Sequence, residues 1–204
     1  MSASEGKVDI GMSARPLKDN EKGLGVQAVE ISRAATVIGV NRSVALKDIS
    51  SDHLCRIYEG RVTNWKDLGA GKDPILALTR PDKDATKETV RMYVPCFKDL
   101  KESPSVITIA TAPEMTKVLN SRPNTIGFTD SVAVEDSAGA IVPLKLDGVE
   151  PSPDQIKSGK YKIIKHNFLV TKGQAAGPVK DFIGFIRSPK GARIIQAHKA
   201  VPVK

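Results

Sequence analysis

Short apolar segments alternate along the chain with segments whose apolar positions recur every three or four residues. The first pattern predicts buried strands and the second predicts amphipathic helices. Strands that alternate with helices are typical of α/β proteins with mostly parallel sheets, so we expect that fold class. The expected strands cover residues 8–12, 35–41, 75–79, 106–110, 125–129, 141–146 and 161–170.

Polar residues indicate where several helices begin. A helix that ends at Gly60 carries apolar residues on one face, and another is expected over residues 178–186. Side-chain oxygens at a helix start accept hydrogen bonds from its unpaired backbone N–H groups. The expected N-cap residues are Ser50 or Ser51, Asp84 and Ser188.

The composition is that of a globular protein. Of the 204 residues, 40% are hydrophobic and 26% are charged, enough for one large core or two smaller ones. The longest apolar run falls short of the roughly 18 residues that span a bilayer, and residues 1–7 lack the apolar centre of a signal peptide. As written, the chain reads as soluble, and it is compatible with export if a signal sequence has been removed.

The charge balance favours an anionic ligand. Lys and Arg number 31 against 23 Asp and Glu, a formal charge of +8, and such a field draws anions to the surface. Nucleic acid is the usual alternative, but the basic residues are spread along the chain and aromatic residues are only 4%. We therefore expect no nucleic-acid partner.

The few cysteines and histidines give no sign of a metal centre or of catalysis. Cys55 and Cys96 cannot form a zinc site alone. We favour two small buried hydrophobic residues, and a disulfide is the alternative left open. His53, His166 and His198 are scattered, without a Ser or Cys that suggests a triad. We predict no metal, no cofactor and no enzymatic activity.

A series of short motifs follows in order along nearly the whole chain. They are Asp9–Leu17 (DIGMSARPL), Val37–Asn41, Leu54–Gly60, Thr63–Gly69 with its Asn-Trp, Asn124–Phe128, Leu146–Pro151 and Ser158–Tyr161. Each motif is weak alone, but the ordered set resembles the periplasmic phosphate-binding proteins, the solute-binding components of ABC phosphate importers.

The resemblance implies a two-lobed clamshell of the type II periplasmic-binding-protein fold. Lobe one would hold residues 1–43 and 160–204, and lobe two residues 44–159. A small oxyanion, phosphate before others, would bind between the lobes, where helix N-termini offer unpaired N–H groups. The partners implied are this anion and an ABC permease, and the location is periplasmic or extracellular.

The start of the chain departs from the family. Members open with a strand, a helix and a Gly- and Ser-rich turn ahead of the strand that Asp9 begins here. Lobe one is therefore expected to lack a strand-helix-strand unit, and we favour truncation over a natural variant, because a lost strand leaves a sheet edge uncovered. On this basis lobe one is expected to self-associate or the chain to bind its anion weakly.

The family's anion-binding motif has a changed counterpart in this chain. In the family, an Arg, a short spacer and then Ser-Gly-Thr at a helix start bind phosphate. Arg80 and Thr86 match that pattern, whereas Asp84 and Ala85 replace Ser and Gly. In the first motif, Ala14 stands where phosphate receptors carry Asp. The candidate ligand-binding residues are Ser13, Arg15, Arg80, Asp84, Ala85 and Thr86.

Asp84 has two interpretations. It could accept the proton of an oxyanion such as hydrogen phosphate, its charge balanced by Arg80, Arg15, Lys83 and Lys87. It could instead be a helix cap alone, which we favour because Asp is a common N-cap and needs no ligand there.

Three further alternatives stay open. Arg15 is either a ligand or a solvated surface charge. Trp65 is expected to be a structural anchor rather than a ligand platform. The alternative function is a sensor or scaffold of the same fold with a changed or lost ligand site.

Overall fold

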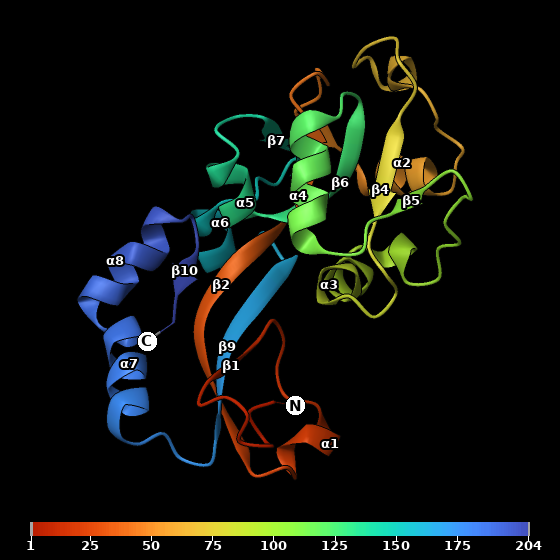
Figure 1. Ribbon diagram of the computed structural model, residues 1–204. Coiled ribbons are helices and arrows are strands. Elements are labelled where there is room, and N and C mark those ends of the chain that lie inside the picture. The colour runs from red at the N-terminus through yellow and green to blue at the C-terminus, as the bar shows by residue number, and fades with distance from the viewer. Residues whose placement is uncertain (1, 204) are drawn as a thin grey trace. The chain divides into compact units, whose positions relative to one another are not determined.

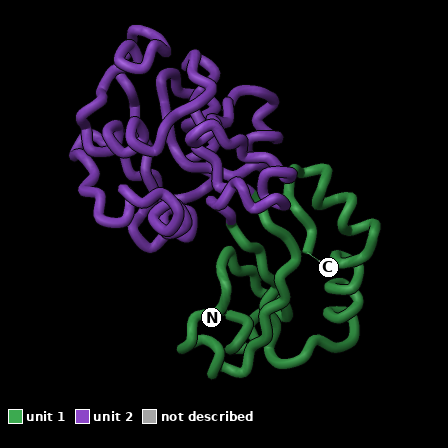
Figure 2. The backbone as a smooth tube through the Cα atoms, turned by 180° about the vertical axis from the view of Figure 1, so that it is seen from behind, with its two compact units in different colours: residues 1–34, 165–204 green, residues 35–164 purple. Residues whose placement is uncertain are grey.

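The computed structural model describes residues 2–203, which fall into two compact units. Unit 1 comprises residues 1–34 and 165–204, and unit 2 comprises residues 35–164 (Figure 2). The boundaries lie inside strand β2 (Val26–Asn41) and at the start of β9 (Ile164–Lys172). The lobe boundaries expected from the sequence lie just outside these two strands, because the sequence shows where a strand pattern ends but not where along a strand its neighbours change.

Unit 1 is built on antiparallel strands with two helices beside them. β1 pairs with β9, β9 lies next to β2, and β10 pairs with β2. Helix α8 lies beside β10, and α7 packs against α8 (Figure 1). The core includes Ile31, Leu169 and Ile183, the last from α7. The other elements are β1 (Gly11–Ser13), α1 (Asp19–Lys22), α7 (Gly177–Arg187), α8 (Pro189–Ala197) and β10 (Val201–Pro202).

Unit 2 contains the second half of β2 and the middle of the chain. β2 pairs antiparallel with β6 and β7, β4 runs parallel to both β6 and β5, and β3 pairs parallel with β8. Helix α4 packs on β6 (Figure 1). The elements are β3 (Asp48–Ile49), α2 (Ser51–Tyr58), η1 (Trp65–Leu68), β4 (Leu76–Thr79), α3 (Ala85–Tyr93), η2 (Pro95–Phe97), β5 (Ile107–Thr108), α4 (Ala112–Ser121), β6 (Thr125–Asp130), α5 (Ser131–Asp136), β7 (Ile141–Pro143), β8 (Lys145–Leu146) and α6 (Pro153–Lys157).

The α/β class expected from the sequence is confirmed, but the expectation of mostly parallel sheets is wrong. β2 pairs antiparallel with β6, β7 and β10. The alternation of strands and helices in the sequence does not show in which direction neighbouring strands run when one long strand pairs with several others. β2 also starts at Val26 rather than near residue 35, and the strand expected over 141–146 is divided into β7 and β8.

Aromatic side chains anchor the core of unit 2. Trp65 is fully buried and its Nε1–H donates to the carbonyl of Asn124 at 3.1 Å, which confirms its role as a structural anchor. Tyr58, Phe97 and Phe128 form a cluster with ring centroids 5.0–5.6 Å apart. The Tyr58 hydroxyl donates to a backbone carbonyl, and burial raises its pKa well above the usual value. This tyrosine is therefore neutral and structural.

Cys55 and Cys96 form a disulfide that joins α2 to η2, with their Cα atoms 6.3 Å apart. The favoured interpretation, two unpaired buried cysteines, is wrong, and the alternative left open is correct. Their separation of 41 positions in the sequence does not indicate that they lie close together, and the packing of η2 against α2 and α3 brings them within bonding distance.

Candidate functional site

The loop that joins β4 to α3 carries most of the candidate anion-binding residues. Arg80 follows the last residue of β4 and is only 6% exposed. Its Nη1 donates to the carbonyl of Ile109 at 2.8 Å, and its Nη2 donates to Oδ2 of Asp84 at 2.7 Å. Its Nε–H is buried without a hydrogen-bond partner among the described residues. An unpaired buried donor costs about 1–3 kcal/mol, so an acceptor delivered here would be stabilised.

Asp84 is the N-cap of α3. Its Oδ1 accepts from the backbone N–H groups of Thr86 at 2.9 Å and Lys87 at 3.3 Å, so Asp84 caps the helix as expected, and a role as a cap alone stays a prediction. With the bond from Arg80, three of the roughly four acceptor positions of a carboxylate are used. Ala85 begins the helix and is partly buried. The cap thus occupies amides that would otherwise face an anion and leaves one acceptor position.

The electrostatics of the loop keep Asp84 ionised. Burial alone raises the pKa of this carboxyl group, but the hydrogen bond and positive charge of Arg80 outweigh it, with help from the backbone N–H groups of Lys87 and Thr86. The resulting pKa lies below the ordinary value. At neutral pH the carboxylate therefore accepts hydrogen bonds and cannot donate one.

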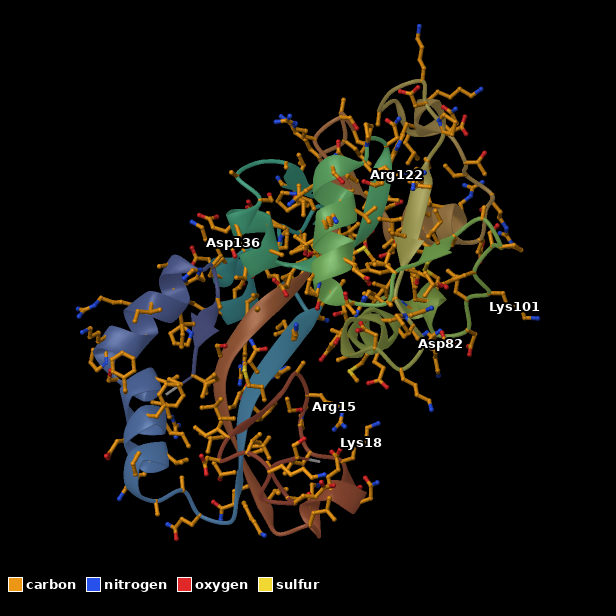
Figure 3. The ribbon with its side chains drawn as sticks, in the orientation of Figure 1. Arg15, Lys18, Asp82, Lys101, Arg122 and Asp136 are labelled. Carbon is orange, nitrogen blue, oxygen red and sulfur yellow. A yellow bond between two sulfur atoms is a disulfide. The ribbon has the colours of Figure 1, made fainter. Side chains whose placement is uncertain are left out.

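Lys87 does not balance the charge of Asp84, which corrects that part of the sequence-based interpretation. Its Nζ lies 3.1 Å from Oδ1 of Asp82 and 2.9 Å from Oε2 of Glu102. Arg91 also pairs with Asp82, labelled in Figure 3 near α3, at 2.7 Å. Glu102 was not expected from the sequence, because it lies in an irregular segment between η2 and β5 with no motif that could have indicated it.

Ser13 and Arg15 lie close together in unit 1. The Ser13 hydroxyl donates to the Arg15 carbonyl at 2.7 Å, and the Arg15 guanidinium binds both oxygens of Glu21 at 2.7 and 2.9 Å. Figure 3 shows Arg15 and Lys18 close to α1. The hydrogen bonds from Arg15 and from the Lys18 backbone lower the pKa of Glu21 to about 2. Arg15 is thus an ion-paired residue rather than a solvated charge.

A hollow of about 420 Å³ lies beside these residues within unit 1. Ser13, Arg15 and Glu21 give it a polar side, and the rest of the lining is largely apolar. The apolar lining residues include Ala3, Val8, Ile10, Met12, Leu17 and Val170.

The candidate residues therefore form two sets, each brought together within its own unit. Ser13 and Arg15 belong to unit 1, and the other four, from Arg80 to Thr86, belong to unit 2. Across residues 2–203 the structure has no group of three or more His, Cys, Asp or Glu side chains suited to a metal ion, and no helix there is long and apolar enough to cross a membrane.

Comparison with known proteins identifies the class. Residues 2–190 match the model of the PBP superfamily domain, and the chain belongs to this superfamily. Over 189 residues it is 31% identical to the phosphate-binding protein PstS of Bacillus subtilis, a match that covers 91% of this chain and 61% of that protein. The chain therefore spans less than two thirds of the length of this relative.

Solved structures agree with this assignment. A structure described as that of a phosphate ABC transporter substrate-binding protein from Clostridium perfringens, with bound phosphate, superimposes with a TM-score of 0.86 at 29% identity. The match covers 100% of this chain and 82% of that one. A phosphate transport receptor from Vibrio cholerae shares the fold, with a TM-score of 0.68 at 21% identity over 98% of this chain and 82% of its own.

Proposed function

We propose that this protein binds phosphate at the Arg80–Thr86 loop and presents it to an ABC-type permease in the membrane. The observation that carries the proposal is the pairing of a buried guanidinium, whose Nε–H lacks a partner among residues 2–203, with an ionised carboxylate at the start of α3. The relatives named as phosphate-binding proteins support the choice of ligand. Ser13 and Arg15 remain predicted ligands from the family resemblance.

Hydrogen phosphate fits these groups chemically. Its oxygens accept from the Arg80 guanidinium and the Thr86 hydroxyl, and its own O–H donates to the remaining acceptor position of Asp84. Sulfate has no proton at neutral pH, so its oxygens would meet the Asp84 carboxylate as like charges. We therefore propose that the loop prefers a protonated oxyanion to a fully ionised one.

The disulfide supports a location outside the cytoplasm. Disulfides persist in oxidising compartments and are rare where thiols are kept reduced. Together with relatives that are binding components of importers, the Cys55–Cys96 bond favours a periplasmic or extracellular binding protein that is not an enzyme. The alternative, a scaffold that has lost its ligand site, is less favoured because Arg80 and Thr86 are retained.

Titration calorimetry with phosphate tests the proposal through Arg80→Ala. We expect this change to weaken binding by about 1.5–3 kcal/mol, the contribution of hydrogen bonds to charged groups. Arg56→Ala is the matched control, since Arg56 forms an exposed pair with Asp52 on α2 and touches no loop residue by any described bond. Equal phosphate affinity of the parent and Arg80→Ala would remove Arg80 from the site.

Asp84→Ser separates the two roles of Asp84. Serine also caps helices, so the cap survives while the carboxylate is lost. If Asp84 accepts the ligand's proton, phosphate affinity falls and sulfate affinity rises. A rise in the affinity for both anions would assign Asp84 to capping alone.

A further inference from the structure

One carboxylate holds both ends of the Arg80–Thr86 loop. Oε1 of Glu102 accepts from the hydroxyl of Thr79 at 2.6 Å, and Oε2 accepts from Nζ of Lys87 at 2.9 Å. Thr79 is the residue before Arg80, and Lys87 is the residue after Thr86. A single side chain from elsewhere in unit 2 therefore joins the strand end that leads into the loop to the helical turn that follows it.

This connection is largely shielded from water. Thr79 is fully buried, the Lys87 side chain is 5% exposed and the Glu102 side chain is 19% exposed. Charge pairs are screened less when buried, and loss of one partner leaves the other charge uncompensated. Lys87 also pairs with Asp82 inside the loop, so the network reaches the middle of the loop as well as its ends.

The segment that carries Glu102 is fixed independently of the loop. Before it, Cys96 is bonded to Cys55 of α2. Next to it, the Ser103 N–H donates to the carbonyl of Tyr58 at 2.8 Å. After it, β5 pairs with β4. Glu102 is thus presented from a segment tied to α2 and to the sheet.

We propose that Glu102 is a positioning residue for anion binding: by bonding Thr79 and Lys87 together it holds Arg80 and Asp84 in the arrangement that receives the ligand. This inference rests on the proposed function of the loop. Glu102 itself does not contact the anion, and it acts through the two residues that flank the loop.

Glu102→Gln tests the role of the charge. Glutamine has the same length, but only one of its two terminal atoms accepts hydrogen bonds, and its amide has no charge to pair with the Lys87 ammonium. Phosphate affinity is expected to fall about tenfold. A change of this size lies within the range of interaction energies measured between residues of one ion-pair network. Glu59→Gln is the control, because Glu59 pairs with Arg61 in the same unit at 3.2 Å and is expected to leave affinity unchanged.

Making Glu102→Gln in a Lys87→Met variant as well as in the parent distinguishes a positioning role from a general loss of structure. In Lys87→Met the charged partner of Glu102 is absent, so Glu102→Gln then removes an uncompensated carboxylate and is expected to cause no further loss of phosphate affinity. The near-UV circular dichroism of each variant verifies that it is folded at the temperature of titration. An equal fold-loss in both backgrounds would overturn the proposal.

Hydrogen exchange of the ligand-free protein gives a readout that needs no phosphate binding. The amides of Thr86 and Lys87, both bonded to Asp84, should exchange faster in Glu102→Gln and at the parent rate in Glu59→Gln. A parent that binds no phosphate contradicts the proposed function while leaving this test intact. Unchanged exchange at both amides would overturn the role of Glu102.

Discussion

Unit 2 and unit 1 stabilise their folds by different means. Unit 2 has the disulfide, the aromatic cluster and the buried network of Glu102 and Lys87. Unit 1 has smaller apolar clusters and leaves several large apolar side chains exposed. The exposed ones are Val8, Met12, Leu24, Phe182, Phe185 and Ile194.

The charges divide in the same way. Lys and Arg number 18 against 17 Asp and Glu in unit 2, but 13 against 6 in unit 1, so the excess positive charge of the chain belongs almost entirely to unit 1. The charges of unit 2 are close to balance, and Arg80, Lys87 and Arg91 near its loop are each paired with a carboxylate. The basic character of the whole chain therefore does not arise from the loop that carries Arg80.

Removal of the disulfide is expected to have the largest effect and to act on unit 2. The disulfide closes a loop between Cys55 and Cys96, which are 41 positions apart in the sequence. Replacing both cysteines with alanine lets the unfolded chain gain conformational entropy, which is expected to lower the free energy of unfolding by about 4 kcal/mol. The single tryptophan, Trp65, reports urea unfolding of unit 2 by fluorescence. An unchanged urea midpoint would show that the bond is not what stabilises this unit.

The exposed apolar side chains of unit 1 provide the second prediction. We expect unit 1 to self-associate, because Met12 is 78% exposed on β1 and Val8 is 42% exposed beside it. Burying such a side chain contributes about 1.5–3 kcal/mol, so Met12→Ser should weaken association at least about tenfold in sedimentation equilibrium. Met92→Ser is the control, because Met92 is 73% exposed but belongs to unit 2. A parent that stays monomeric at high concentration contradicts this expectation.

The smallest expected effect concerns the ion pair of unit 1 and its dependence on pH. The folded pKa of Glu21 is lowered from 4.5 to about 2, so the pair with Arg15 stabilises the fold above about pH 4.5 and loses this contribution as the pH falls toward 2. Urea unfolding should show Glu21→Gln less stable than the parent at pH 7, with the difference vanishing by pH 2. A difference that is constant with pH would mean that the charge is not its source.

Features set by neighbours in sequence could be predicted well. The cap of α2 at Ser50, the cap of α3 at Asp84 and the start of α8 after Ser188 all appear where the polar residues indicated them. These caps depend on a side chain and backbone N–H groups two or three residues away, and that information is local. The loop with Arg80 and Thr86 was found because it forms a contiguous motif.

Features set by residues far apart in the sequence could not be predicted. The first half of β2 was missed because Gln27, Glu30 and Arg33 make it look too polar for a strand. In the structure Glu30 is paired with Arg33 and with His166 of β9, so its charge is compensated. Glu102 and the disulfide were missed or left open for the same reason, since their partners are fixed by packing.

The continuous strand β2 has a consequence for how the chain folds. In unit 1 it pairs with β10 through Arg33 and Val201, and in unit 2 with β6 through Thr36 and Asp130. Successive side chains of a strand point to opposite faces, so a slip of one residue exchanges every inward side chain for an outward one. A slip along the whole of β2 would spoil both cores at once. Once β2 pairs correctly in one unit, its pairing in the other unit is therefore restricted to the correct register during folding.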